Sequence, residues 1–129
     1  MKEKIKLLEG LPFISLTILH NNESILIENV LIDTGSASTI VKGDILEEIG
    51  VRPEDDDLLG SISGVGGCES VYLKRIDGIQ IGELVINDFT IDVGIMDYGF
   101  DINGIIGMDL LSKIYSNIDL ETFFITGHS

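Results

Sequence analysis

The 129-residue sequence contains little cysteine, little proline and no tryptophan. Its single cysteine, Cys68, excludes an internal disulfide. The two histidines, His20 and His128, lie far from Cys68 and from each other, so no cysteine–histidine pattern with zinc spacing is present. We therefore expect neither a metal centre nor a cofactor.

Basic residues are also few. Lysine and arginine together number 8, against 22 aspartates and glutamates, which gives a formal net charge of -14 at pH 7. Such a surface repels phosphate backbones and anionic headgroups, so nucleic acid and membranes are excluded as expected partners. No apolar run has the length of a signal peptide or of a bilayer-spanning helix, and we expect a cytoplasmic protein.

The length and composition indicate one globular domain over residues 1–129 with one core. Fifteen glycines but only two prolines favour short strands joined by tight turns. The predicted strands are 11–19, 25–32, 38–41, 59–65, 69–74, 79–81, 84–86, 89–93, 117–120 and 123–126. Helices are predicted over 44–49, with a capping box of Asp44 and Glu47 and a stop at Gly50, and over 108–114. The expected fold class is mostly β with one or two short helices.

One motif carries chemistry: Asp33-Thr34-Gly35-Ser36, directly after the apolar run 25–32. An Asp-[Ser/Thr]-Gly tripeptide arises by chance in about one in twenty chains of this length. Its plain alternative is an Asx-turn at the end of a strand. Two further segments follow in order, the glycine-rich stretch 64–67 between two predicted strands and the segment 104–111, Gly-Ile-Ile-Gly-Met-Asp-Leu-Leu. No helix follows the stretch 64–67, which argues against a phosphate-binding loop.

Together these segments resemble the retropepsin family, the single-domain homodimeric aspartic proteases of retroviruses and their cellular relatives. The resemblance covers about residues 11–127. It is closest to the protease-like domain of the DNA-damage-inducible ubiquitin-shuttle proteins, which share the Gly64-Val65-Gly66 tip and a closing segment like 116–120. It implies an acid-protease closed barrel with a flap hairpin at about 59–74. It also implies a C-terminal hairpin at about 115–127, which we expect to build the dimer interface.

The resemblance implies an aspartic endopeptidase that acts on a peptide or protein substrate. In such enzymes two close carboxylates share one proton, so that one acts as base toward water and the other as acid. Asp33 is the one aspartate of this chain in an Asp-[Ser/Thr]-Gly motif, so the second carboxylate must come from another copy. We therefore expect a homodimer with an Asp33 pair at its axis.

The resemblance also assigns roles to neighbouring residues. Asp33, Thr34 and Gly35 are the catalytic residues: Asp33 holds the water, Thr34 braces the two loops across the axis, and Gly35 lets the substrate approach. Ser36 is expected to donate its hydroxyl to the carboxylate. The remaining substrate-binding residues are three at the tip of the flap and one in a side-chain pocket, namely Val65, Gly66, Gly67 and Ile105.

Two positions depart from the retroviral pattern. Ala37 and Met108 stand where retroviral enzymes have an acidic residue and an arginine that pair with each other. This loss keeps an alternative open, a catalytically silent dimeric module that binds an extended peptide in the same cleft. The intact Asp33-Thr34-Gly35 favours the enzyme.

Overall fold

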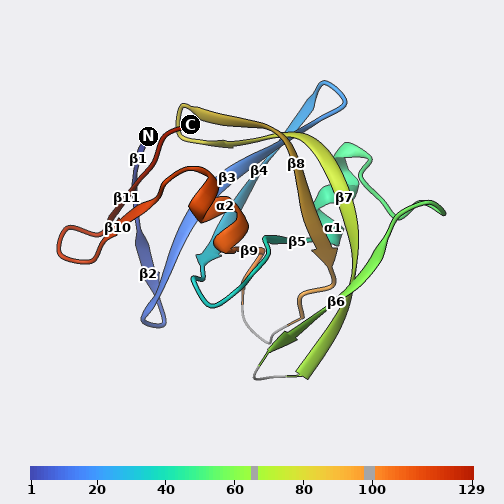
Figure 1. Ribbon diagram of the computed structural model, residues 1–129, viewed down its shortest axis with the longest axis horizontal. Coiled ribbons are helices and arrows are strands. Elements are labelled where there is room, and N and C mark those ends of the chain that lie inside the picture. The colour runs from blue at the N-terminus through green and yellow to red at the C-terminus, as the bar shows by residue number, and fades with distance from the viewer. Residues whose placement is uncertain (65–66, 98–100) are drawn as a thin grey trace.

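The computed structural model describes residues 1–64, 67–97 and 101–129, and it is built mostly of strands (Figure 1). The strands are β1 (Lys2–Lys4), β2 (Lys6–Leu8), β3 (Leu11–His20), β4 (Glu23–Ile32), β5 (Ile40–Lys42), β6 (Leu59–Gly64), β7 (Gly67–Ile81), β8 (Leu84–Gly94), β9 (Gly104–Ile106), β10 (Asn117–Asp119) and β11 (Phe124–Thr126). The helices are α1 (Gly43–Leu46), the 3-10 turn η1 (Glu47–Ile49) and α2 (Met108–Lys113). The predicted fold class is confirmed.

The main sheet closes on itself. Its strands pair in the order β3, β4, β9, β5, β8 and β7, and β7 pairs again with β3 through Thr17 and Gln80. The β4–β9 and β5–β8 pairs are parallel, and the others in this ring are antiparallel. β2 and β6 extend the sheet beyond the ring, beside β3 and β7. The pairings therefore form the closed barrel that the resemblance implied.

Several predicted elements differ from the structure. The strands predicted at 69–74 and 79–81 are one strand, β7, and those at 84–86 and 89–93 are one strand, β8. Strand β8 continues through Asp88 because aspartate tolerates the left-handed φ of 53° found there. The capping box is wrong: the first helix begins at Gly43, so Asp44 lies inside its first turn, and Lys42 at the cap makes no side-chain bond. Gly50 ends this helical segment at φ 76°, as predicted.

The strands bury side chains on two faces. The larger cluster fills the barrel and includes Leu16, Ile18, Ile76 and Ile79, each at most 1% exposed. A second cluster lies on the other face of the sheet. Its buried members are Phe13, Ile40, Val71, Met96 and Ile102, and Leu8, Leu31, Ile62 and Ile105 pack against them.

The two ends of the chain meet in a small second sheet of order β1, β11, β10 (Figure 1). The terminal amine of Met1 donates to the Gly127 carbonyl at 2.9 Å, and Ile125 is fully buried. The predicted C-terminal hairpin is therefore present, and it packs on the N-terminus of its own chain. In the described part of the chain, no helix has the length and apolar character needed to cross a membrane.

Candidate active site

The Asp33 loop leaves the barrel at the end of β4. Parallel pairing of β4 with β9 places Ile32 opposite Ile106, and both side chains are buried in the barrel core. The pairing continues one residue further, because the Asp33 amide donates to the Ile106 carbonyl at 3.0 Å. The Ser36 amide then donates to the Asp33 carbonyl at 3.1 Å and closes a tight turn. The backbone of Asp33 is thus fixed to the barrel on one side and to its own turn on the other.

The Asp33 carboxylate is half-buried at the surface of this turn. Its Oδ1 accepts a hydrogen bond from the Gly35 amide at 2.8 Å, which orients the group. Thr34 and Gly35 beside it are exposed. A Cβ added at Gly35 would lie 3.1 Å from Asp33 Oδ1, so a side chain there would crowd the carboxylate. The turn therefore presents one oriented carboxylate to the outside of the chain.

The other expected site residues are only partly brought together. The Ser36 hydroxyl donates to the Ser38 carbonyl at 2.8 Å, a different acceptor from the Asp33 carboxylate that we expected. Ile105 is half-buried opposite Leu31 in the second cluster. Gly67 begins β7 opposite Gly64, so the flap hairpin exists as β6 and the first part of β7. The remaining tip positions, Val65 and Gly66, lie outside the described residues.

Hydrogen bonds around the buried Thr39, which were not predicted from the sequence, also support the Asp33 loop. Thr39 is fully buried, and its hydroxyl donates to Asp109 Oδ1 at 2.7 Å while accepting from the Gly107 amide at 3.1 Å. The Thr39 amide donates to the other Asp109 oxygen at 3.1 Å. The only local signal was an aspartate in the first turn of a predicted helix, where acidic residues are common. The structure uses that aspartate to bind a residue 70 positions earlier.

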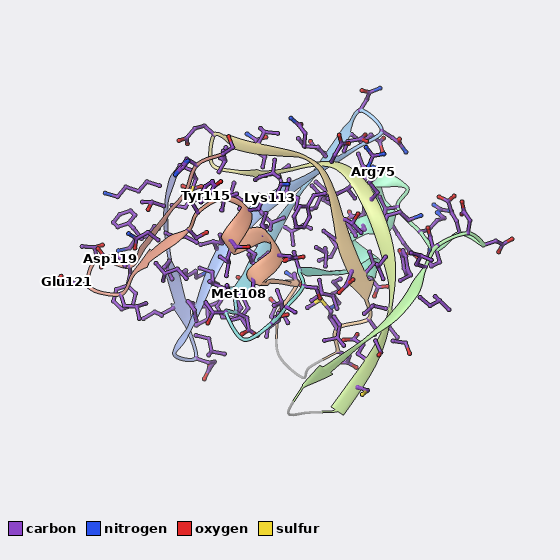
Figure 2. The ribbon with its side chains drawn as sticks, in the orientation of Figure 1. Arg75, Met108, Lys113, Tyr115, Asp119 and Glu121 are labelled. Atoms are coloured by element: carbon purple, nitrogen blue, oxygen red, sulfur yellow. The ribbon has the colours of Figure 1, made fainter. Side chains whose placement is uncertain are left out.

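The start of α2 also packs directly on the backbone of the loop. The Met108 amide donates to the Ser36 carbonyl at 2.8 Å, and the Asp109 amide donates to the Ala37 carbonyl at 3.2 Å. Figure 2 shows Met108 at this end of α2, beside the barrel. The two positions that depart from the retroviral pattern therefore take part in backbone bonds between the loop and the helix.

Ion pairs connect the acidic loop 54–57 to strand β7 at the base of the flap hairpin. Lys74 on β7 is 9% exposed and contacts Asp57 at 2.9 Å and Glu54 at 3.2 Å. Burial alone lowers the pKa of Lys74, but the hydrogen bonds to both carboxylates outweigh it, and the net pKa is raised. The bond from Lys74 lowers the pKa of Asp57. The acidic loop 54–57 is thus attached to the flap strand by a nearly buried cation.

An apolar hollow of about 370 Å³ opens beside the base of the flap. Leu59, Tyr72, Val93 and Ile95 are among the residues that line it, and the Asp33 loop is not. Within the described residues, no group of three or more histidine, cysteine, aspartate or glutamate side chains is arranged to hold a metal ion. The hollow therefore belongs to the flap base, and the Asp33 turn stands apart from it.

Comparisons with known proteins bear on the family and the fold of the chain. A family model described as aspartyl protease matches residues 16–110, a span that includes both the Asp33 loop and the start of α2. The structure is similar to a retropepsin-like aspartic protease from Rickettsia conorii, with a TM-score of 0.69 and 17% identity over 99% of this chain and 94% of that one. It is also similar to EIAV protease complexed with the inhibitor HBY-793, with a TM-score of 0.63 and 22% identity over 88% of this chain and 96% of that one. A search of curated proteins gives no significant match.

These comparisons confirm the retropepsin-like fold, since both structural neighbours cover most of the chain. At such identities they show the fold alone. The closer likeness to the domain of the ubiquitin-shuttle proteins stays a prediction.

Proposed function

The chain belongs to the aspartyl protease family, and from that premise we propose that it is an aspartic endopeptidase active as a homodimer. In this proposal Asp33 from each copy holds and activates the lytic water at the dimer axis. Thr34 braces the two loops, and Gly35 admits the substrate backbone. One carboxylate takes a proton from water while the other protonates the leaving amine. No cofactor is needed for this chemistry.

The observation that carries the proposal is the oriented Asp33 carboxylate. A plain Asx-turn needs the bond from the Gly35 amide to Oδ1 and nothing more. Here the same turn is also bonded through its backbone to β9 and to the start of α2. A catalytic side chain must be held in one position, and bonds to two elements provide that support. A single chain supplies one such carboxylate, which is half of the dyad that the chemistry needs.

The C-terminal hairpin is our proposed dimer contact. Strand β10 lies at the edge of the small sheet, where its second edge is available to another strand. Leu120, just after it, is 65% exposed and would be covered by a second copy that pairs along this edge. Removing the whole hairpin is a poor test, because the fully buried Ile125 would leave the core with it. A test that leaves the fold intact is preferable.

The first test is cleavage of a mixed peptide library at high protein concentration, between pH 4 and 7. We expect cuts from the wild type, with an optimum below neutrality because the dyad needs one shared proton. Asp33→Asn keeps the shape of the side chain and should reduce cleavage by about 100-fold or more. Equal cleavage by both proteins would contradict the assignment of Asp33. No cleavage by a wild type that sediments as a dimer would favour the peptide-binding module instead.

Mixing the two proteins tests the shared site. If every active unit needs two intact copies, adding an equal amount of Asp33→Asn chain to a fixed amount of wild type should reduce the activity to about half, since half of the intact pairs are replaced by mixed ones. A chain that works alone would keep its full activity in the mixture. Sedimentation of the same samples shows whether the copies have associated.

A further inference from the structure

A continuous row of side chains crosses the sheet on the face of the second cluster. Strand pairing places Phe13 opposite Leu31, Leu31 opposite Ile105, Ile105 opposite Ile40, and Ile40 opposite Asp92. Side chains that lie directly opposite each other in neighbouring strands point to the same face. The first four members all belong to the second cluster, so this face is apolar until it reaches Asp92.

The same row leads to the Asp33 carboxylate. Leu31 is two residues before Asp33, and side chains two residues apart in a strand point to the same side. Ile105, which we expected to line a substrate pocket, is the neighbour of Leu31 in the row. Leu31 and Ile105 are half-buried, whereas Phe13 and Ile40 are only 2% and 1% exposed, so a substrate held over Asp33 would lie against Leu31 and Ile105. Asp92, which is half-buried, follows Ile40 in the same row.

Asp92 is held in place from two directions. Its amide donates to the Thr39 carbonyl at 2.9 Å, and its Oδ2 accepts from the Ser38 hydroxyl at 2.5 Å. The side chain is half-buried. All lysines, arginines and histidines of the chain fall within the described ranges, and none of the ion pairs found there includes Asp92. The row thus ends in a fixed carboxylate with a hydroxyl partner and no cation of its own chain.

Taking the proposed function as given, we propose that Asp92 is a specificity-determining residue that selects substrates with a lysine or arginine near the scissile bond. A substrate that lies over Asp92 displaces water from it, and a carboxylate that has lost water without gaining a cation becomes costly. A basic side chain of the substrate removes that cost by pairing with Asp92, and an uncharged one does not. The hydrogen bond from the Ser38 hydroxyl fixes the orientation of the Asp92 carboxylate.

The spacing of the strands predicts where the basic residue lies. Three strand-to-strand steps separate Leu31 from Asp92, a distance of about 14 Å at ~4.8 Å per step. An extended peptide covers that distance in about four residues. A long substrate side chain can also reach Asp92 from a position closer to the scissile bond. We therefore expect the preference for lysine or arginine two to four residues from that bond. A two-fold dimer presents Asp92 twice, and the preference should appear on both sides of the bond.

The experiment compares peptides that differ only in having lysine, glutamine or glutamate at these positions. For the wild type we expect kcat/KM to be about tenfold or more higher with lysine, and this ratio to fall as salt is raised. Asp92→Asn should bring the ratio near one, Asp92→Glu should retain a preference for lysine, and Asp92→Lys should favour glutamate over lysine. Each ratio is measured within one protein, so a variant that folds incompletely still reports its preference.

Asp88→Asn is the matched control, with the same substitution in the same strand. Asp88 pairs with Arg75 at 2.7 Å, and both side chains are well exposed. Figure 2 shows Arg75 on the other side of the barrel from Met108 and the catalytic loop. This control should keep the wild-type ratio. Cleavage with no lysine preference, or a preference that survives in Asp92→Asn, would overturn the role of Asp92 alone. Absence of any cleavage by the wild type would overturn the proposed function with it.

Discussion

Replacing Thr39 by valine removes one hydroxyl from beneath the Asp33 loop while keeping the shape of the side chain. That hydroxyl donates to Asp109 at 2.7 Å and accepts from the Gly107 amide at 3.1 Å, in a fully buried position. A hydrogen bond to a charged group contributes about 1.5–3 kcal/mol, and a buried amide without a partner costs about 1–3 kcal/mol. The two effects overlap, because Asp109 keeps its bonds from the Thr39 and Leu110 amides. We expect Thr39→Val to lower the free energy of unfolding by about 2–4 kcal/mol.

Thermal unfolding measures this effect. For a domain of this size, a loss of that magnitude lowers Tm by about 10 °C. The wild type and the variant must be compared at the same protein concentration, because the Tm of an oligomer depends on it. Thr90→Val is the matched control, since Thr90 is exposed on β8 and its change should stay within about 0.5 kcal/mol. Equal Tm values for the two variants would refute the idea that the Thr39 hydroxyl holds the loop to α2.

Two further predictions follow from the loop and the flap base. Gly107→Ala should destabilise the protein by about 3 kcal/mol or more and abolish cleavage, since the new Cβ would lie 2.3 Å from the Ser38 carbonyl oxygen, a backbone atom. The control Gly10→Ala has nothing near its new Cβ and should lower the free energy of unfolding by only about 1–2 kcal/mol, because of its positive φ. Similar losses for both variants in urea titrations would contradict the clash at Gly107. Lys74→Met should destabilise the protein more at pH 6 than at pH 3. Because the bond from Lys74 lowers the pKa of Asp57 in the folded state, this stabilisation is present above the unfolded value of 3.8 and is lost as pH falls through the folded pKa. A difference in urea midpoint that is the same at both pH values would argue against the ion pair.

The elements that were predicted well from the sequence are those that a short local pattern determines. The apolar run that ends just before Asp33 is β4, and the strands predicted on either side of the glycine-rich stretch pair with each other as β6 and β7. Residues 104–107 lead into α2, the helix that the pattern predicted over 108–114. In each case a short run of residues determines the element, because a turn or a strand end needs particular residue types.

The features that were missed depend on partners far away in the chain. β1 has the sequence Lys-Glu-Lys and β2 the sequence Lys-Leu-Leu, and neither shows the apolar alternation that marks a strand. They form because they pair with β11 and β3. The bonds between Thr39 and Asp109 span 70 residues. Strand β7 extends through Asp77 and Gly78, which lie between the strands predicted at 69–74 and 79–81, because Gly78 pairs with both β8 and β3. Tertiary pairing here overrides local preference.

Bonds to distant parts of the chain also hold the exposed Asp33 loop in a fixed position. A surface turn that carries a reactive carboxylate has few contacts of its own, and loops of this kind are usually mobile. In this chain the loop is bonded to β9 through Asp33, to α2 through Ser36 and Ala37, and to the half-buried Asp109 through the buried Thr39. Gly107 makes the approach of α2 possible, because any side chain there would push the helix away from the loop. In the enzyme that we propose, Gly107 and the buried Thr39 would therefore be needed as well as the Asp-Thr-Gly motif, because they hold the Asp33 loop against α2.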